Sequence, residues 1–563
     1  MEQVIPAGVE CKVLSAEGNK ESAANYADYA NGAHQELFLA PHSRNRRNSR
    51  LILCFLQNYI GLYLQDTWKA TRRLTVSAGL RWEPFKPMYD ADGRALFFSQ
   101  EAFDNGLRST VYKNAPAGLL FPGDTGYPYG NSKAIGPSAL LHFAPRLGLA
   151  WDPHGDGRMA VRAAYGVFFD YPHFYEYSGM LKDPPWGYGV TLTNPGGGFE
   201  DPWRGVPGGN PFPAPLTPDI RFTQAGDYLS VPPSLKYPYM NQWNLSIQRG
   251  IGADWLVAAN YIGNNVIHLT DALQVNPSVY LPGSSCVIGG QTYSPCTSTA
   301  NVLQRRKLFL QNPTEGQYYG NLIEPYSGGT RNYNAMVLSV QRRRSHGVTV
   351  QGNYTFGHCI DDGHPGANLD GRFGGELNER RKFSRGNCDS DRRHNMNMST
   401  VYETPQFSNS TLRMLGTGWQ VSGIVRVLSG SWLTISTGVD SLATNGDTIP
   451  NLVLPSPYTP DKGIDLYLNP AAFARPATGE YGNFGRSNIQ GPGSIRIDMG
   501  LTRKFQVREK QTVEFRVEAF NLPNHLNPGN PSTAGLTLTS PTFGRIQTAL
   551  DERIIQLALK YVF

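Results

Sequence analysis

The 563-residue sequence contains no apolar run long enough to cross a membrane as a helix. Such a helix needs about 20 consecutive apolar residues, and the longest apolar stretch, 51–56, is far shorter. Charged residues are scarce, at 17% of the chain, against roughly 25% in soluble domains. The net charge of +6 forms no basic stripe between aromatic residues. These absences exclude helical membrane proteins and argue against nucleic-acid binding.

Signatures of catalysis are also absent. The sequence has no GxSxG, HExxH or phosphate-binding P-loop motif. The aspartate-rich segments 90–93 and 152–157 lack the ligands of a calcium loop and indicate turns. We therefore predict no catalytic residues, no cofactor and no metal. Four neighbouring side chains of metal-ligand type do not have the spacing of a metal site, and we interpret them as part of a loop: His358, Asp361, Asp362 and His364.

Residues typical of turns and of the boundary between membrane and water are plentiful. The chain has 61 glycines and 41 prolines, which indicate many turns and long loops. Aromatic residues reach 11%, with 29 tyrosines and 9 tryptophans. Tyrosine and tryptophan suit the boundary between membrane and water, because one end of each side chain is apolar and the other is polar.

The C-terminal segment 553–563, RIIQLALKYVF, shows the most informative alternation. Leu557, Leu559, Tyr561 and Phe563 fall on one face of a strand, since side chains alternate with period 2. A chain that ends on an aromatic residue after such a strand resembles the last strand of bacterial outer-membrane β-barrels. That resemblance implies that Tyr561 and Phe563 belong to the signal read by the barrel-assembly machinery. A soluble edge strand is the alternative.

About thirteen segments alternate in this way, and they predict an all-β protein. Short connections, such as 69–72 and 250–254, alternate with long polar loops, such as 85–144 and 264–331. Outer-membrane barrels combine short periplasmic turns with long external loops. We predict a transmembrane antiparallel β-barrel with strands near 58–67, 72–84, 145–151, 158–169, 239–249, 254–263, 332–343, 348–357, 392–403, 416–428, 493–505, 511–521 and 553–563.

The number of strands indicates that the barrel is partial. Single-chain bacterial barrels have an even number of strands and begin in the periplasm, whereas these segments are odd in number and the first runs inward. The N-terminus MEQVIPAGVECK also lacks the basic and apolar regions of a signal peptide. We therefore expect further strands and an export signal upstream.

Six separated motifs resemble one family in a single order. YIGLYLQDTWKATRRLTVSAGLRWE at 59–83 and FAPRLGLAWDP at 143–153 are similar to strand pairs of TonB-dependent outer-membrane transporters, most closely the Oar-like branch. The second motif continues to residue 170, and the four further motifs lie within 333–362, 390–405, 513–531 and 541–546.

The resemblance implies a barrel of about 22 strands with a plugged lumen, of which this chain supplies about 13. We expect 58–563 to be the C-terminal portion of the barrel and 1–57 to be a poorly defined N-terminal remnant. The export signal, carboxypeptidase-regulatory-like domain, TonB box and plug of the family are absent from the sequence.

The function implied by the family is ligand uptake across the outer membrane. Its partners would be membrane lipid, the TonB complex through the missing N-terminal part, and a ligand that is an oligosaccharide, a peptide or a metal chelate. Three alternatives are a surface adhesion or secretion-assisting role, a passive porin, and a soluble extracellular β-rich enzyme, for which no catalytic set is found.

Two pairs of cysteines each share a predicted external loop. The oxidising cell envelope favours disulfides, which limit the freedom of long loops; free thiols in flexible loops are the alternative. Two further cysteines, Cys11 and Cys54, have no obvious partner. Aromatic residues in 170–180 and 184–189 could form a ligand surface or pack the loops together, and the sequence does not favour either. The candidate disulfides are Cys286 with Cys296 and Cys359 with Cys388.

Overall fold

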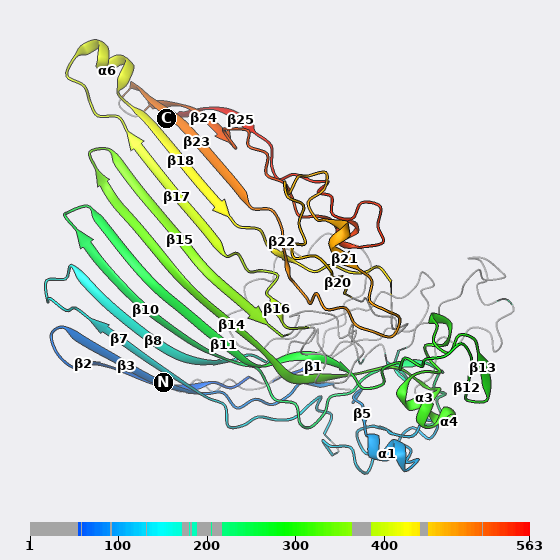
Figure 1. Cartoon of the computed structure of the whole chain (residues 1–563). Helices are drawn as coiled ribbons and strands as arrows, with labels where there is room; N and C mark the ends of the chain where they lie inside the picture. The colour runs from blue at the N-terminus through cyan, green and yellow to red at the C-terminus, as the bar shows by residue number, and fades with distance from the viewer. Residues whose placement is uncertain are drawn as a thin grey trace.

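Thirteen strands follow one another, each antiparallel to the next, across one sheet (Figure 1). The structure, a computed structural model, describes residues 55–57, 59–90, 93–130, 132–171, 180, 183–187, 204, 217–362, 384–439, 449–508 and 511–563. The thirteen strands are β2 (Leu62–Lys69), β3 (Leu74–Trp82), β7 (Phe143–Trp151), β8 (Met159–Phe169), β10 (Tyr239–Ile251), β11 (Trp255–Gln274), β14 (Tyr319–Ser345), β15 (Val348–Asp361), β17 (His394–Glu403), β18 (Trp419–Leu428), β23 (Ser494–Arg508), β24 (Gln511–Phe520) and β25 (Ile554–Val562). Every predicted strand is confirmed.

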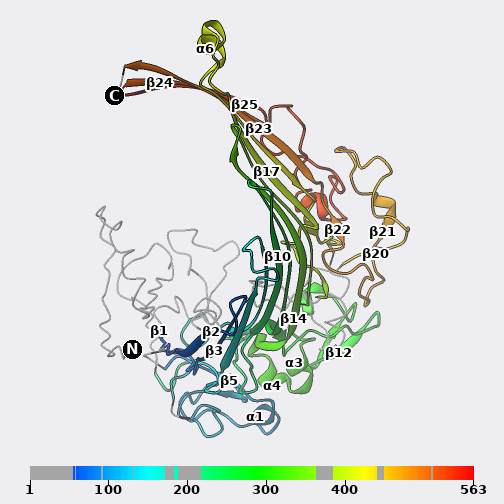
Figure 2. The same cartoon turned by 90° about the vertical axis from the view of Figure 1, so that its left-hand side faces the viewer.

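The sheet is curved but open, as Figure 2 shows. Its two edge strands are β2, which pairs only with β3, and β25, which pairs only with β24. All residues of both edge strands are exposed, and Phe563 is 90% exposed. Among the described residues the sheet therefore does not close on itself, which agrees with the prediction of a partial barrel.

Two strands are longer than the sequence predicted. β11 has 20 residues and β14 has 27, and both continue into the segment 264–331 that was expected to be a loop. Their pairing continues from Ile267↔Thr330 to Gln274↔Ile323 through irregularities near Leu269. Backbone hydrogen bonds alone can extend a two-stranded ladder. The extensions of β11 and β14 therefore need no alternation of apolar and polar residues, and their sequence shows no period of 2.

The long connections also contain secondary structure of their own. β9 (Gly226–Leu229) pairs in parallel with β14, and β16 (Gly386–Asn387) pairs with β15. The remaining short strands and helices are β1 (Phe55–Leu56), β4 (Tyr89–Asp90), β5 (Phe97–Phe98), α1 (Gln100–Asp104), β6 (Leu119–Leu120), β12 (Cys286–Ile288), β13 (Gln291–Tyr293), η2 (Thr299–Asn301), α3 (Lys307–Gln311), α4 (Pro313–Gly316), α6 (Ser410–Gly416), β19 (Trp432–Leu433), β20 (Asn451–Leu452), η3 (Pro470–Ala472), β21 (Phe473–Ala474), β22 (Ile489–Gln490) and η4 (Ala534–Leu536).

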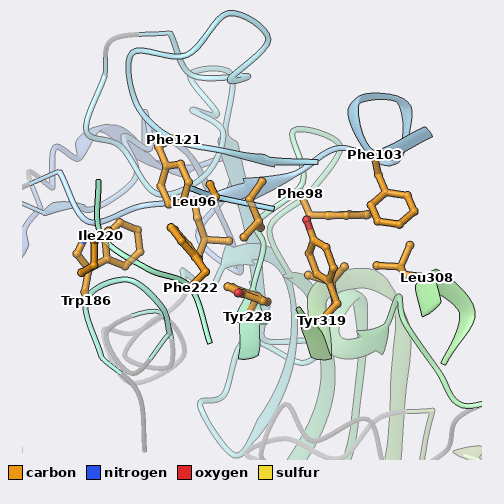
Figure 3. Close-up of a cluster of buried hydrophobic side chains, with 13 residues drawn as sticks. Leu96, Phe98, Phe103, Phe121, Trp186, Ile220, Phe222, Tyr228, Leu308 and Tyr319 are labelled. Atoms are coloured by element: carbon orange, nitrogen blue, oxygen red, sulfur yellow. The ribbon is translucent and has the colours of Figure 1, made fainter. Parts of the chain in front are cut away.

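Two loop lobes at the long-loop end of the sheet have hydrophobic cores. We call the described parts of 83–142, 170–238 and 275–318 the first lobe, and those of 429–493 and 521–553 the second lobe. One core of the first lobe packs aromatic side chains of 83–142 and 170–238 against Leu308 of 275–318 and against Tyr319 (Figure 3). The core of the second lobe includes Ile435, Leu468 and Phe543. The connections that the sequence predicted as long polar loops thus contain packed cores, which the local sequence does not indicate because apolar residues scattered over separate loops meet only in the folded chain.

Truncating Leu119 should destabilise the first lobe, because this side chain is fully buried in its core. Leu119→Ala is expected to lower the local free energy of unfolding by about 2–5 kcal/mol. The measurement is hydrogen exchange of the first-lobe amides in the full chain. Leu107→Ala is the matched control: Leu107 is 56% exposed in the same lobe, so about 0.5 kcal/mol or less is expected. Equal exchange in the two variants would contradict the packed core.

Candidate functional site

The two faces of the sheet differ in chemistry. The strand registers align Leu501 with Val517 and Val517 with Leu557 on one face. The same registers align Val76 with Leu149 at the other end of the sheet. We call this the apolar face. In membrane barrels such a face contacts lipid, and the alternate residues line the interior.

Charged side chains form a ladder on the opposite face, which we call the polar face. Glu514 lies 2.6 Å from Arg516 and 3.7 Å from Lys504 on the neighbouring strand. Arg516 also lies 3.6 Å from Glu518. These alternating positive and negative side chains pair with one another along the wall, so the ladder leaves little net charge for a ligand.

A hollow of about 420 Å³ lies on the polar face. The register places Met240 opposite Val266, and Val266 opposite Arg331, so the side chains that line it point to one side of the sheet. The hollow is near the end of the wall where the long loops begin. Its lining comprises Met240, Asn264, Val266, Arg331, Tyr333, Thr355, Cys359, Ser390, Asp391, Arg392 and Asn395.

One side of this hollow is held by a buried carboxylate. Asp361, which is 1% exposed, accepts a hydrogen bond from Arg331 Nη2 at 2.8 Å and pairs with Arg486 of the second lobe. Arg486 Nε also donates to the carbonyl of Ser384 at 2.8 Å. Two cations compensate the cost of burying the carboxylate. We call these contacts the clasp, because they connect the second lobe to β14 and to the long-loop end of β15.

The segment 384–391 is attached to the same rim. Asp391 accepts hydrogen bonds from the backbone N–H of Cys359 at 3.2 Å and from Trp432 Nε1 at 3.0 Å. The backbone N–H of Cys388 donates to the carbonyl of Cys359 at 3.1 Å. The segment therefore forms a fixed border of the hollow.

Two arginines supply positive charge next to the hollow. Arg392 lines it, and Arg426 lies on the polar face opposite Asn397 and Arg496. Burial, together with the nearby charge of Arg426, lowers the pKa of Arg392. Arg392 donates to the carbonyl of Ser429 at 3.0 Å, but within the described ranges neither arginine forms an ion pair with a carboxylate. An anionic group would be attracted to this position.

The structure does not assemble the metal-ligand residues into a metal site. Asp361 belongs to the clasp, and Asp362 pairs with Arg385 at 2.6 Å. His358 Nδ1 lies 2.7 Å from Arg393 Nη2. Across the part of the chain that the structure describes, no group of three His, Cys, Asp or Glu side chains could hold a metal. His364 lies outside that part.

The aspartate-rich segments behave as the turn prediction states. Asp152 accepts hydrogen bonds from the backbone N–H groups of Gly155 at 2.8 Å and Gly157 at 2.9 Å. Both glycines have positive φ, which other residues rarely adopt. Asp90 instead forms a buried ion pair with Arg94 at 2.8 Å.

Both candidate pairs of cysteines are bonded in the structure. The Cα atoms of Cys286 and Cys296 are 5.3 Å apart, and those of Cys359 and Cys388 are 5.4 Å apart. Both separations are typical of disulfides. That they form in the cell stays a prediction. Cys11 and Cys54 lie outside the described residues.

The aromatic segments contribute to packing where they are described. Trp186 is 7% exposed and belongs to the first-lobe core, where its ring lies 5.7 Å from that of Phe121. Tyr171 stacks on Phe85 at 4.3 Å. Most of 170–180 and of 188–189 lies outside the described residues, so these contacts concern only part of the segments.

Sequence reasoning missed a second hollow, of about 390 Å³, between the first lobe and the extensions of β11 and β14. Glu324, His268 and Lys236 are among its lining residues. Ser230 Oγ donates to Glu324 at 2.9 Å, and burial raises the pKa of Glu324 to about 7. These residues come from three separate segments, and no local pattern in the sequence groups them.

Comparison with known families gives one match over most of the chain. The sequence profile described as outer membrane beta barrel domain matches residues 12–556. No curated protein matches the sequence. Among the described residues, no helix has the length and apolar character needed to span a membrane.

Several solved structures are similar to the chain at low identity. The outer membrane transporter YddB from Escherichia coli has a TM-score of 0.43 and 11% identity, covering 91% of this chain and 46% of that one. The FrpB iron transporter from Neisseria meningitidis has a TM-score of 0.40 and 11% identity, with 91% and 46% covered. The ferripyoverdine receptor of Pseudomonas aeruginosa has a TM-score of 0.41 and 10% identity, with 91% and 39% covered. The chain thus spans less than half the length of these structures.

Glu324 lies on the extension of β14 and is joined to the first lobe by Ser230, so its raised pKa predicts that the packing of this lobe depends on pH. A carboxyl group with a pKa of about 7 in the folded state and near 4.3 when unfolded binds its proton more tightly in the folded state. Its contribution to stability is therefore fully present below about pH 4.3 and is lost as the pH rises through 7. Glu324→Gln should remove this loss, so the variant should exchange first-lobe amides more slowly than the natural chain at pH 8, and equally at pH 4. If the variant and the natural chain differed in exchange rate by the same factor at pH 4 and at pH 8, the raised pKa of Glu324 would be contradicted.

The bond between Cys359 and Cys388 should appear in peptide maps of the full chain. Digestion without reductant should give a linked peptide pair that separates on reduction. Cys388→Ser should make 384–391 more sensitive to protease, because a crosslink over 29 residues contributes on the order of 3 kcal/mol. Cys296→Ser is the control, since it should affect only the first lobe. Alkylation of Cys359 without reductant would contradict the pairing.

Proposed function

The chain belongs to the family of outer membrane beta barrel domains, and we propose that it forms part of the wall of a TonB-dependent transporter that takes up an anionic ligand. It resides in the outer membrane and is not an enzyme. The observation that carries the proposal is the hollow on the polar face next to Arg392 and Arg426. In a barrel that face lines the interior, where a ligand passes.

The charge near the hollow favours some ligands over others. Arg392 and Arg426 provide guanidinium groups that bind carboxylate or phosphate oxygen atoms through two parallel hydrogen bonds. Tyr333 and Met240 line the same hollow and offer apolar area for the rest of the ligand. Acidic metal chelates, acidic peptides and acidic oligosaccharides match this combination better than neutral sugars.

Active transport requires more than the part of the wall in this chain. The edge strands β2 and β25 have unpaired outer edges, and an unpaired edge is unfavourable in lipid. We propose that further strands outside these 563 residues close the barrel, with a plug and a TonB-binding segment. Tyr561 and Phe563 keep their predicted role in recognition by the assembly machinery.

The arginine pair provides the test of the ligand class. Ferric citrate, an anionic metal chelate, is the probe, and its binding to the purified full chain is measured by calorimetry. Arg392→Gln combined with Arg426→Gln should weaken binding by about tenfold or more, because each charge-assisted hydrogen bond contributes about 1.5–3 kcal/mol. Arg344→Gln is the control, since Arg344 is exposed at the short-turn end. Unchanged binding in the double variant would overturn the anionic-ligand proposal.

Uptake by whole cells tests the transporter role separately. Disrupting the gene should lower accumulation of the probe, and an uncoupler should lower it in the parent strain to the same level. Uptake that persists with the uncoupler would indicate a passive porin. Unchanged uptake together with a defect in cell contact would indicate the surface adhesion role.

A further inference from the structure

The connection between β17 and β18 differs from the other short connections. It spans 404–418 and contains the helix α6, whereas β14 and β15 are joined by His346 and Gly347 alone. Figure 1 shows α6 beyond the short-turn end of the sheet. We propose that α6 anchors the barrel wall in the phospholipid of the inner, periplasmic leaflet of the outer membrane, at the boundary between headgroups and acyl chains.

Local hydrogen bonds fix the helix. The Asn409 side chain caps its N-terminus, accepting from the backbone N–H groups of Thr411 at 3.0 Å and Leu412 at 3.2 Å. Arg413 folds back toward the start of the connection, donating to the carbonyls of Phe407 at 3.0 Å and Ser408 at 2.9 Å. The first turn of α6 and the Arg413 side chain are therefore held by hydrogen bonds within the connection.

The helix is attached to the apolar face of the wall. Trp419 Nε1 donates to the carbonyl of Leu415 at 2.7 Å, and Arg503 Nη2 donates to the carbonyl of Met414. Trp419 and Arg503 are register partners on the same face as Leu501. The Arg503 guanidinium lies 5.0 Å from the ring centroid of Trp419 and 4.6 Å from that of Phe505. These contacts place the C-terminal end of α6 on the side of the wall that meets lipid.

Three large apolar side chains of α6 are exposed. Leu412 is 54% exposed, Met414 is 67% exposed and Leu415 is 58% exposed. Leu412 and Leu415 are three residues apart and so share one face of the helix. Full burial of side chains of this size contributes about 1.5–3 kcal/mol each, so a partner that covers them would be bound favourably.

The neighbouring wall identifies lipid as that partner. Exposed aromatic side chains lie near the short-turn ends of other strands, all on the apolar face according to the registers. Tryptophan and tyrosine collect at the membrane–water boundary, so α6 continues an interface that the membrane already covers. These aromatic residues are Trp68, Trp151, Trp255, Tyr402, Phe505 and Tyr561.

Photocrosslinking tests the proposal directly. Leu412, Met414 or Leu415 is replaced by p-benzoylphenylalanine in the complete barrel protein as the cell makes it, which is purified and reconstituted in vesicles of phosphatidylethanolamine and phosphatidylglycerol with labelled phosphatidylethanolamine. The same replacement of His346, at the tip of the β14–β15 turn, is the control. Irradiation should give about fivefold more lipid adduct at Leu412 and Leu415 than at His346, as expected for a helix in the interface.

Two results would overturn the proposal. One is an amount of lipid adduct at Leu412, Met414 and Leu415 no greater than at His346, in variants that keep the heat-dependent gel shift of the unsubstituted complete barrel. The other is crosslinking of these positions in cells to a periplasmic protein in place of lipid. Met414 provides a third position if a substitution at Leu412 or Leu415 prevents folding.

Discussion

Inside a lipid bilayer there is no water to hydrogen-bond the backbone, so each N–H and C=O group of the wall needs a partner in the protein. The ladder from β2 to β25 supplies these partners strand by strand. Every other feature depends on this ladder, because its register decides which side chains face lipid and which face the interior. The pairing of Leu501, Val517 and Leu557 on one face requires Thr502, Arg516 and Ala558 to meet on the other.

The long-loop end of the wall is stabilised by buried hydrophobic cores in addition to backbone hydrogen bonds. Outside the bilayer the chain can bury apolar groups in ordinary cores, and the two lobes do so. The clasp then joins the second lobe to the wall through Asp361, whose burial is compensated by Arg331 and Arg486. Loss of one arginine would leave a buried charge poorly compensated. The position of the second lobe beside the hollow therefore depends on an ion pair as well as on apolar packing.

Charge on the polar face divides into two regions with different roles. On β23 and β24, acidic and basic side chains pair along the wall, which satisfies them without a ligand. Next to the hollow, Arg392 and Arg426 have no such pairing within the described part of the chain, and burial makes the charge of Arg392 costly. A bound anion would reduce that cost, which supports the proposed anionic ligand.

The sequence by itself determined the thirteen strands, their short and long connections and the membrane class. Alternation with period 2 is a local signal, imposed on each strand by two different surroundings on its two faces. The alternation did not predict the extensions of β11 and β14, because their two faces do not have different surroundings. Tertiary structure alone decided the lobe cores, the hollows and the clasp, because Asp361 and Arg486 are 125 residues apart and nothing in either local sequence indicates the other. It also decided the place of α6, which Trp419 and Arg503 fix against the lipid-facing side only after β18 and β23 have paired.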